Sequence, residues 1–270
     1  MFRTRLISGI VLVILALLFI ITGGYVLLAV SLALSLIGLM ELYRVFGFHK
    51  SSLGILGYCL VILYYGLLMA ETLYGCNIPW MLYLIVVLMA CSLLLVCTYP
   101  NYTSNQIMQA VFGILYTGVM FSFLYKTRML ENGSYSVWLI FLSSWGCDTC
   151  AYCAGKLFGK HKMSPVLSPK KSVEGAIGGV LGSMILTFIY ASVFAAKMEI
   201  TGTQIWILTL ISGAGACISM VGDLTASAIK RCFDIKDYGK LIPGHGGVLD
   251  RFDSVIFTAP MIYFLAFYFF

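Results

Sequence analysis

The residues best suited to chemistry lie close together in the last quarter of the chain. Asp223, Ser227 and Lys230 are spaced i, i+4 and i+7, so a helix through this segment would place them on one face. Asp250 and Asp253 are one helical turn apart. Hard carboxylate oxygens suit Mg²⁺ that keeps waters and binds substrate phosphates. The pattern therefore predicts a magnesium site, with a second cation left open, whose ligands come from Asp223, Asp250 and Asp253. Asp148, a carboxylate near the end of an expected membrane helix, is a further candidate for a functional role.

A second group of residues suits the binding of phosphate. Gly246 and Gly247, which follow His245, would let the backbone approach a phosphate group closely. Lys170 and Lys171 stand just before an expected helix, where ammonium groups and free N–H groups together favour phosphate. These residues therefore predict a polyphosphate or lipid-phosphate ligand.

Each feature also has a structural interpretation. Asp148 could be a polar helix terminus, Pro243-Gly244 a turn, and Lys236 and Asp237 solvated charges. The lysines of a cytoplasmic loop in a membrane protein need no further reason. It is the combination of all these features within one chain that favours a functional site.

Three cysteines, Cys147, Cys150 and Cys153, have a spacing similar to iron–sulfur ligation. Such a cluster normally needs a fourth thiolate from nearby sequence. The three residues fall at i, i+3 and i+6 of an expected membrane helix, where cysteine is a small packing residue. We therefore expect packing, and neither a cluster nor disulfides.

The composition identifies the solvent in which these residues must be positioned. Of 270 residues, 61% are hydrophobic and 10% are charged, and the mean hydropathy is +0.98. Soluble domains carry about 25% charged residues. The chain is thus neither a soluble globular protein, nor disordered, nor a nucleic-acid binder with a broad basic surface. Its long apolar runs lack the alternation of a β-barrel, so we expect helices.

The gaps between charges delimit the expected helices. No Asp, Glu, Lys or Arg occurs between Arg5 and Glu41, between Glu71 and Lys126, or after Asp253. A membrane span needs about 20 apolar residues. The predicted fold class is therefore an all-α polytopic integral membrane protein with about nine transmembrane helices, at 6–22, 24–40, 53–70, 80–98, 107–125, 135–152, 175–196, 204–222 and 254–270.

The basic residues indicate how these helices are oriented. With a cytoplasmic N-terminus and an external C-terminus, fourteen of the seventeen basic residues face the cytoplasm, and only Lys126, Arg128 and Lys197 face outward. Arg3 and Arg5 before the first apolar stretch could also mark a cleaved signal peptide, but 20–24 is a poor cleavage site. The net charge of +6 suits an anionic lipid surface or a polyphosphate.

The chain divides into two regions that differ in their chemistry. Residues 1–133 hold no acidic residue within an expected span and read as an N-terminal transmembrane scaffold. Residues 134–270 read as a catalytic transmembrane region with cytoplasmic segments at 153–174 and 223–253. No internal repeat relates the two regions.

The stretch from Ser227 to Asp253 resembles the signature of the phosphatidate cytidylyltransferase family, the CDP-diacylglycerol synthases. The residues that carry the resemblance are Ser227-x-Ile229-Lys230-Arg231, Lys236-Asp237 and Pro243-x-His245-Gly246-Gly247-x-x-Asp250-Arg251-x-Asp253. The stretches 148–159 and 168–175 are similar to other blocks of the family. Ser172 and Val173 depart from it, since the family more often has Thr and an aromatic residue there.

The resemblance implies a Mg²⁺-dependent membrane enzyme that joins CTP and phosphatidate into CDP-diacylglycerol and pyrophosphate. Asp223 and Asp250 would hold the metal, with Asp148 and Asp253 either as further ligands or as residues that hydrogen-bond to the ligands. The residues expected to be catalytic are Asp223, Ser227, Lys230, Arg231, His245 and Asp250. Those expected to bind substrate are Ser168, Lys170, Lys171, Lys236, Lys240, Gly246, Gly247 and Arg251. Among them, Lys170 and Lys171 would contact the phosphatidate headgroup, whereas Lys230 and Arg231 would neutralise CTP phosphates.

Two other functions stay open from the sequence. A CTP-dependent lipid or polyprenol kinase would transfer the γ-phosphoryl group, and a carrier of anionic lipid would use the basic face without turnover. The paired broken helices of many carriers are missing from the sequence pattern. The expected partners are CTP, phosphatidate and the membrane, without nucleic acid, and the family is compatible with a homodimer. We expect a bacterial-type inner (plasma) membrane and a cytoplasmic active site.

Overall fold

The computed structural model describes residues 2–269, with side chains from Ser8 onward. Phe270, the end of the last expected span, lies outside the described residues. The side chains of Arg3 and Arg5, which we expect on the cytoplasmic side, also lie outside the described part.

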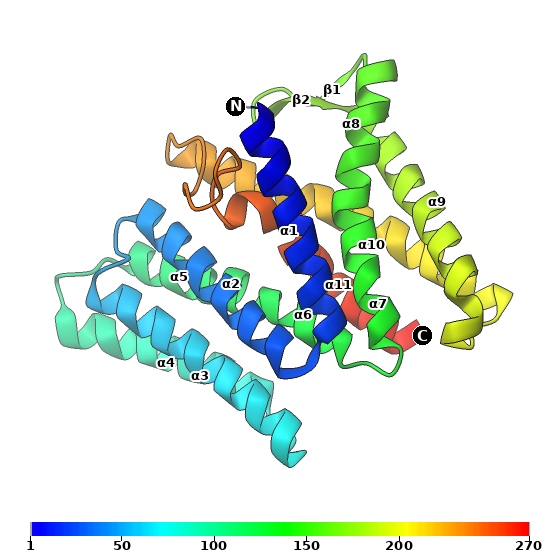
Figure 1. Ribbon diagram of the computed structural model, residues 1–270. Helices are drawn as coiled ribbons and strands as arrows, with labels where there is room; N and C mark the ends of the chain where they lie inside the picture. Colours follow the sequence, from blue (N-terminus) through cyan, green and yellow to red (C-terminus); the bar gives the residue numbers. More distant parts are fainter. Residues whose placement is uncertain (1, 270) are drawn as a thin grey trace.

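Helices make up most of the described chain, with one short hairpin (Figure 1). The helices are α1 (Phe2–Thr22), α2 (Gly24–Phe46), α3 (Ser52–Tyr74), α4 (Trp80–Thr98), α5 (Ser104–Gly113), α6 (Met120–Arg128), α7 (Gly133–Phe141), α8 (Cys147–Phe158), α9 (Val173–Met198), α10 (Gly202–Cys232) and α11 (Leu249–Phe269). Two π-helical segments, η1 (Ile114–Val119) and η2 (Leu142–Gly146), join α5 to α6 and α7 to α8 without a break. The antiparallel strands are β1 (Lys162–Ser164) and β2 (Ser168–Ser172).

Seven helical stretches of the described chain are long and apolar enough to cross a membrane, namely α2, α3, α4, α5–η1–α6, α9, α10 and α11. Each coincides with an expected span. The other two expected spans are α1, of which the part with described side chains, Ser8–Thr22, is an apolar helix, and α7–η2–α8, which contains Ser143, Ser144 and Asp148. The predicted all-α polytopic membrane fold is confirmed, and the count of nine spans stays a prediction.

Several helices extend beyond the boundaries expected from the apolar runs. The second expected span ends at 40, but α2 continues to Phe46, so that Glu41 lies inside a helix of the N-terminal region. The expectation that this region holds no acid within a span is therefore wrong. The eighth expected span ends at 222, but α10 continues to Cys232, because the Asp223–Lys230 segment is polar yet still helix-forming. The last helix begins at Leu249, ahead of its expected start.

Local capping explains where several helices begin. The side-chain oxygens of Ser51, Thr103, Ser172 and Thr201 each accept a hydrogen bond from the backbone amide three residues later. These bonds satisfy one of the free N–H groups at a helix start. For α9, the Ser172 cap fixes the point at which the hairpin turns into the membrane.

Two clusters of buried side chains hold the helices together. One lies among α2, α3, α4 and α5, and the other surrounds α10 and α11 with α6 and α7. Tyr43 anchors the first cluster, because its hydroxyl donates to the Ala110 carbonyl at 2.8 Å. A Cβ at Gly57 or Gly113 would come within 2.4 or 2.6 Å of the Tyr43 side chain, so both positions must lack one. The two clusters meet at α6, which packs against both α2 and α11.

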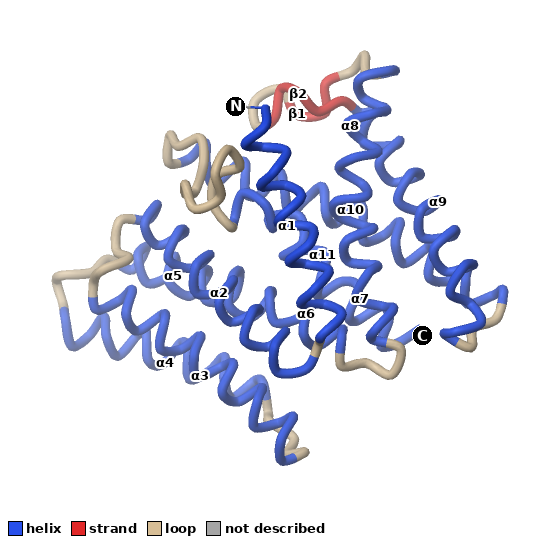
Figure 2. Tube along the Cα trace, viewed as in Figure 1, coloured by secondary structure: helices blue, strands red, loops and turns tan. Residues whose placement is uncertain are grey.

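The segments predicted to be cytoplasmic gather at one end of the molecule. The start of α1, the β1–β2 hairpin and the 233–248 loop lie there, and α11 ends at the opposite side (Figures 1 and 2). Ser8 of α1 donates to the carbonyl of Pro243 in that loop at 3.0 Å. At the other end, the Arg128 side chain donates to the Ile20 carbonyl at 3.1 Å. The arrangement is compatible with the predicted orientation in the membrane, which stays a prediction.

Candidate active site

The polar end of α10, beyond its apolar part, carries the first predicted group of residues. Asp223, Ser227 and Lys230 lie on successive turns of this continuous helix, as their spacing predicts. Asp223 forms an ion pair with Lys171 of β2, and the half-buried Ser227 stands one turn further on. Arg231, at the end of α10, is exposed.

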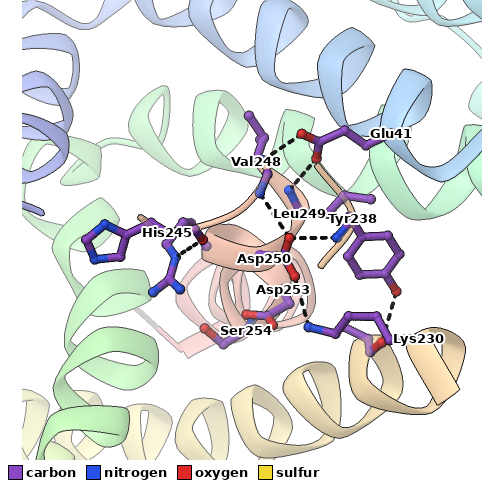
Figure 3. Close-up of polar contacts among 12 residues, drawn as sticks. Glu41, Lys230, Tyr238, His245, Val248, Leu249, Asp250, Asp253 and Ser254 are labelled. Carbon is purple, nitrogen blue, oxygen red and sulfur yellow. Dashed lines mark hydrogen bonds and ion pairs between the residues drawn. The ribbon is translucent and has the colours of Figure 1, made fainter. Parts of the chain in front are cut away.

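Asp250, in the first turn of α11, connects three segments of the chain (Figure 3). Its Oδ1 accepts from the Lys230 ammonium at 2.9 Å. Its Oδ2 accepts from the backbone amides of Tyr238 at 2.8 Å and Gly247 at 3.0 Å. The Asp250 side chain is only 4% exposed, so these bonds offset the cost of burying its charge. In this structure Asp250 is therefore turned toward Lys230 and the loop amides.

The three remaining aspartates come together from three helices. Asp148 of α8, Asp223 of α10 and Asp253 of α11 interact electrostatically with one another. Asp253 accepts from the Ser254 amide at 2.8 Å, and Asp148 is hydrogen-bonded to the Ser254 side chain. Among the described residues, the ion pairs include Asp223 but neither Asp148 nor Asp253. Asp148 and Asp253 of this acidic cluster (Asp148, Asp223 and Asp253) therefore have no directly paired cation in the described part of the chain, and Lys171, Arg251 and Lys230 act on them only from a greater distance.

The donor chemistry of the acidic cluster fits a divalent cation. Carboxylate oxygens are the ligands that Mg²⁺ prefers, and unpaired carboxylates at a partly buried place favour a cation. Within the part of the chain that the structure describes, no three Asp, Glu, His or Cys side chains are already arranged so that they could hold a metal ion. Lys171 neutralises Asp223, so an ion bound here would share or displace that ammonium group.

A cavity of about 410 Å³ opens beside the acidic cluster. It lies between α8, the hairpin, α9 and α10, and we call it the interfacial cavity. On its outer face, α9 exposes the apolar side chains of Ile177 and Leu181. Asp148, Asp223, Lys156, Lys170 and Lys171 supply the charges of the cavity, and small or apolar side chains supply the rest, among them Ala151, Tyr152, Met163, Ala176 and Met220. Ser168 lies at the start of β2, outside this lining. Such walls suit a ligand with an anionic head and an apolar body.

A second cavity, of about 650 Å³, lies against the 233–248 loop and is far more polar. We call it the loop cavity. Its lining includes Lys236, Lys240, His245, Gly246 and Arg251, all of which we expected to bind substrate or take part in catalysis. Gly247 stands outside this lining, with its amide bonded to Asp250. The His245 ring lies 2.6 Å from the Ser8 hydroxyl, measured from Nδ1, and Arg251 donates to the His245 carbonyl at 2.9 Å.

Two residues at the site escaped the sequence analysis. Tyr238 is buried, and its hydroxyl donates to the Ala226 carbonyl at 3.0 Å. Burial, with the carboxylates of Asp250 and Asp253, raises the pKa of Tyr238 well above its usual range, so that it remains a donor. Glu41 of α2 accepts from the backbone at the start of α11. The one signal for Glu41 in the sequence was its position as an acidic residue directly after an unbroken apolar run.

Two of the three clustered cysteines of α8, Cys147 and Cys150, lie along its contact with α9. Cys147 is buried, Cys150 is half-buried and Cys153 is exposed. A Cβ at Gly179 would lie 2.9 Å from the Cys147 sulfur, and one at Gly182 would lie 2.5 Å from the Cys150 sulfur. The first two cysteines therefore fill the space that glycines leave open on α9, which is the packing role that we expected.

Comparisons with known proteins connect this geometry to a family. A model described as "Cytidylyltransferase family" matches residues 3–269. The chain is similar to phosphatidate cytidylyltransferases of Staphylococcus epidermidis, at 34% identity over 62% of this chain and 64% of the relative, and of Staphylococcus aureus, at 35% over 62% and 64%. The similarity to the protein of that name from Staphylococcus saprophyticus is 36% over 56% and 55%. The chain thus matches less than two thirds of the length of these relatives.

Proposed function

Because the chain belongs to the cytidylyltransferase family, we propose that it transfers the cytidylyl group of CTP to phosphatidate. A phosphate oxygen of phosphatidate forms a new bond to the α-phosphorus of CTP. The bond from that phosphorus to the β-phosphate oxygen breaks, and the products are CDP-diacylglycerol and pyrophosphate. The relatives named phosphatidate cytidylyltransferase support this choice of substrates.

The observation that carries the proposal is the acidic cluster beside a cavity with apolar walls. Lys170 and Lys171 offer positive charge to a phosphate head in the interfacial cavity. The acyl chains could remain against the outer face of α9, which exposes Ile177 and Leu181. A phosphate bound there would lie next to Asp223 and Asp148, where the proposed metal would be.

The loop cavity suits the triphosphate of CTP. Lys236, Lys240 and Arg251 carry positive charge there, and His245 can add a hydrogen bond. Such cations neutralise the nucleotide phosphates and the developing charge on the leaving pyrophosphate. Lys230 lines neither cavity and forms an ion pair with Asp250. It would therefore support the site by fixing that carboxylate.

The reaction needs no strong general base, because a phosphomonoester is already anionic near neutral pH. The protein must instead bring two anions together, which is a task of positioning and charge neutralisation. Asp148, Asp223 and Asp253 would hold Mg²⁺, and that ion would supply positive charge to the phosphates. The site would face the cytoplasm of a bacterial-type cell, where CTP is present.

The test uses purified protein with Mg²⁺, phosphatidate, and CTP labelled in either the α- or the γ-phosphate. We expect label in the lipid only from the α position, with release of pyrophosphate. Label from the γ position would establish a lipid kinase instead. Binding of phosphatidate without Mg²⁺-dependent turnover would favour a carrier, and the molar mass in detergent would test the expected homodimer.

A further inference from the structure

Glu41 is a buried carboxylate that reaches the site from the N-terminal region. It is 2% exposed and belongs to α2. Its Oε1 accepts from the Val248 amide at 3.0 Å, and its Oε2 accepts from the Leu249 amide at 2.9 Å (Figure 3). A carboxylate at a helix start satisfies free N–H groups and is favoured by the helix dipole. Glu41 thereby caps α11 from a different helix.

The glycines of the loop make room for this carboxylate. A Cβ on Gly247 would lie 2.3 Å from the Glu41 Oε1, and a Cβ on Gly239 would lie 2.4 Å from the same atom. Neither glycine is among the residues with positive φ, so the requirement at these positions is space and not backbone conformation. Gly247 is thus needed because Glu41 is there.

Glu41 and Asp250 together occupy the amides at the start of α11. Gly247 donates to Asp250, whereas Val248 and Leu249 donate to Glu41. These amides would otherwise be available to a phosphate. Glu41 therefore holds the turn from which His245 and Arg251 face the loop cavity, without lining that cavity itself.

From these contacts, and on the basis of the proposed function, we infer that Glu41 is a positioning residue for the nucleotide side of the site. It fixes the turn between the loop cavity and α11, and with it the side chains that would bind the CTP phosphates. The interfacial cavity, proposed for phosphatidate, is lined by α8, the hairpin, α9 and α10. Loss of Glu41 should therefore weaken CTP use and leave phosphatidate saturation unchanged.

The first experiment compares Glu41→Gln and Glu41→Asp with Glu131→Gln, which removes a charge from an exposed loop position. In Glu41→Gln, an amide NH₂ group opposes one backbone N–H, and the unmade bond at a buried amide corresponds to a loss of about tenfold to hundredfold. We expect kcat/KM for CTP to fall by that factor, with a higher KM for CTP and the same KM for phosphatidate. Glu41→Asp keeps the charge and should recover part of the loss.

A merely structural role would lower kcat through loss of active protein and leave both KM values unchanged. That result, or equal increases in both KM values, would overturn the inference. The CTP-dependent rise in thermal midpoint of each variant is a second readout. It separates the two proposals, because a wild type that binds CTP but transfers nothing would contradict the proposed function alone.

The second experiment is a double-mutant cycle between Glu41 and Gly247. Gly247→Ala should raise the KM for CTP severely in the presence of Glu41, because its methyl group meets the carboxylate. In a Glu41→Ala background the same change should have little further effect, since the space is then free. Additive effects would show that Gly247 is needed for a reason other than Glu41, and would overturn the inference.

Discussion

Each aspartate at the site has a different set of partners, so substitutions at them should have different consequences. Asp250 is buried and fully bonded. Asp148 and Asp253 belong to the acidic cluster, and neither of them forms an ion pair with a described cation. Asp223 belongs to the same cluster but also forms an ion pair with Lys171. Removal of the charge of Asp250 should therefore destabilise the folded protein, whereas removal of the charge of Asp223 should leave the protein folded.

We expect Asp223→Asn to lower turnover by about a hundredfold or more while folded protein is recovered. The substitution removes charge that would hold Mg²⁺ and neutralise Lys171, but it also relieves repulsion from Asp148 and Asp253. The measurements are cytidylyl transfer and the thermal midpoint in detergent. Asp234→Asn, at an exposed position just beyond α10, is the matched control, and near-normal turnover in Asp223→Asn would contradict the metal assignment.

Lys230→Met should destabilise the protein by about 3 kcal/mol, because it leaves the buried Asp250 carboxylate without its cation. The Asp250 side chain is buried and that of Lys230 is half-buried, at 4% and 15% exposure. The double variant Lys230→Met/Asp250→Asn should recover much of the thermal midpoint, since the uncompensated charge is gone. If the thermal midpoint of the double variant fell by as much as the two single variants together, the result would contradict a stabilising pair between Lys230 and Asp250.

At the scale of elements, the contact between α8 and α9 shapes the interfacial cavity. Small residues face one another along it, so the two backbones approach closely. A Cβ at Gly178 would lie 2.3 Å from the Ala154 Cβ. Since α8 and α9 both line the cavity, their separation should control its width.

Gly178→Ala should therefore force α8 and α9 apart, with a cost of about 1–3 kcal/mol from overpacking. We expect a higher KM for phosphatidate and a lower thermal midpoint, with little change in the KM for CTP. Gly66→Ala is the control, because a Cβ at Gly66 of α3 meets nothing within 4 Å. A change confined to the KM for CTP would show that this contact does not shape the lipid site.

At the scale of the whole molecule, the expected orientation predicts which loops share a side of the membrane. In a cysteine-free background, Lys160→Cys and Lys240→Cys should react with an impermeant thiol reagent from the cytoplasmic face only. Glu131→Cys should react from the outer face only. All three positions are exposed. Reaction of positions 160 and 240 from opposite faces would contradict the arrangement of nine spans.

The sequence by itself determined the fold class and much of the local geometry of the site. Hydrocarbon allows only internally hydrogen-bonded helices for long apolar runs, so composition and charge gaps were sufficient to predict an all-α membrane protein. Spacing was sufficient to place Asp223, Ser227 and Lys230 on one face of α10, because helical periodicity is a local property. Boundaries were less predictable, since polar residues such as Glu41 can continue a helix beyond its apolar part.

Only the tertiary structure decided which charges meet. Spacing along α10 suggests that Lys230 serves the same ligand as Asp223, but Lys230 pairs with Asp250 and Asp223 pairs with Lys171. Glu41 reaches α11 across about two hundred residues of sequence. Such pairs depend on the register in which helices pack, and that register is set by close contacts such as those of Gly178 and Gly113. Periodicity within one helix carries no information about its register against another, because that register minimises the packing energy of many distant side chains at once.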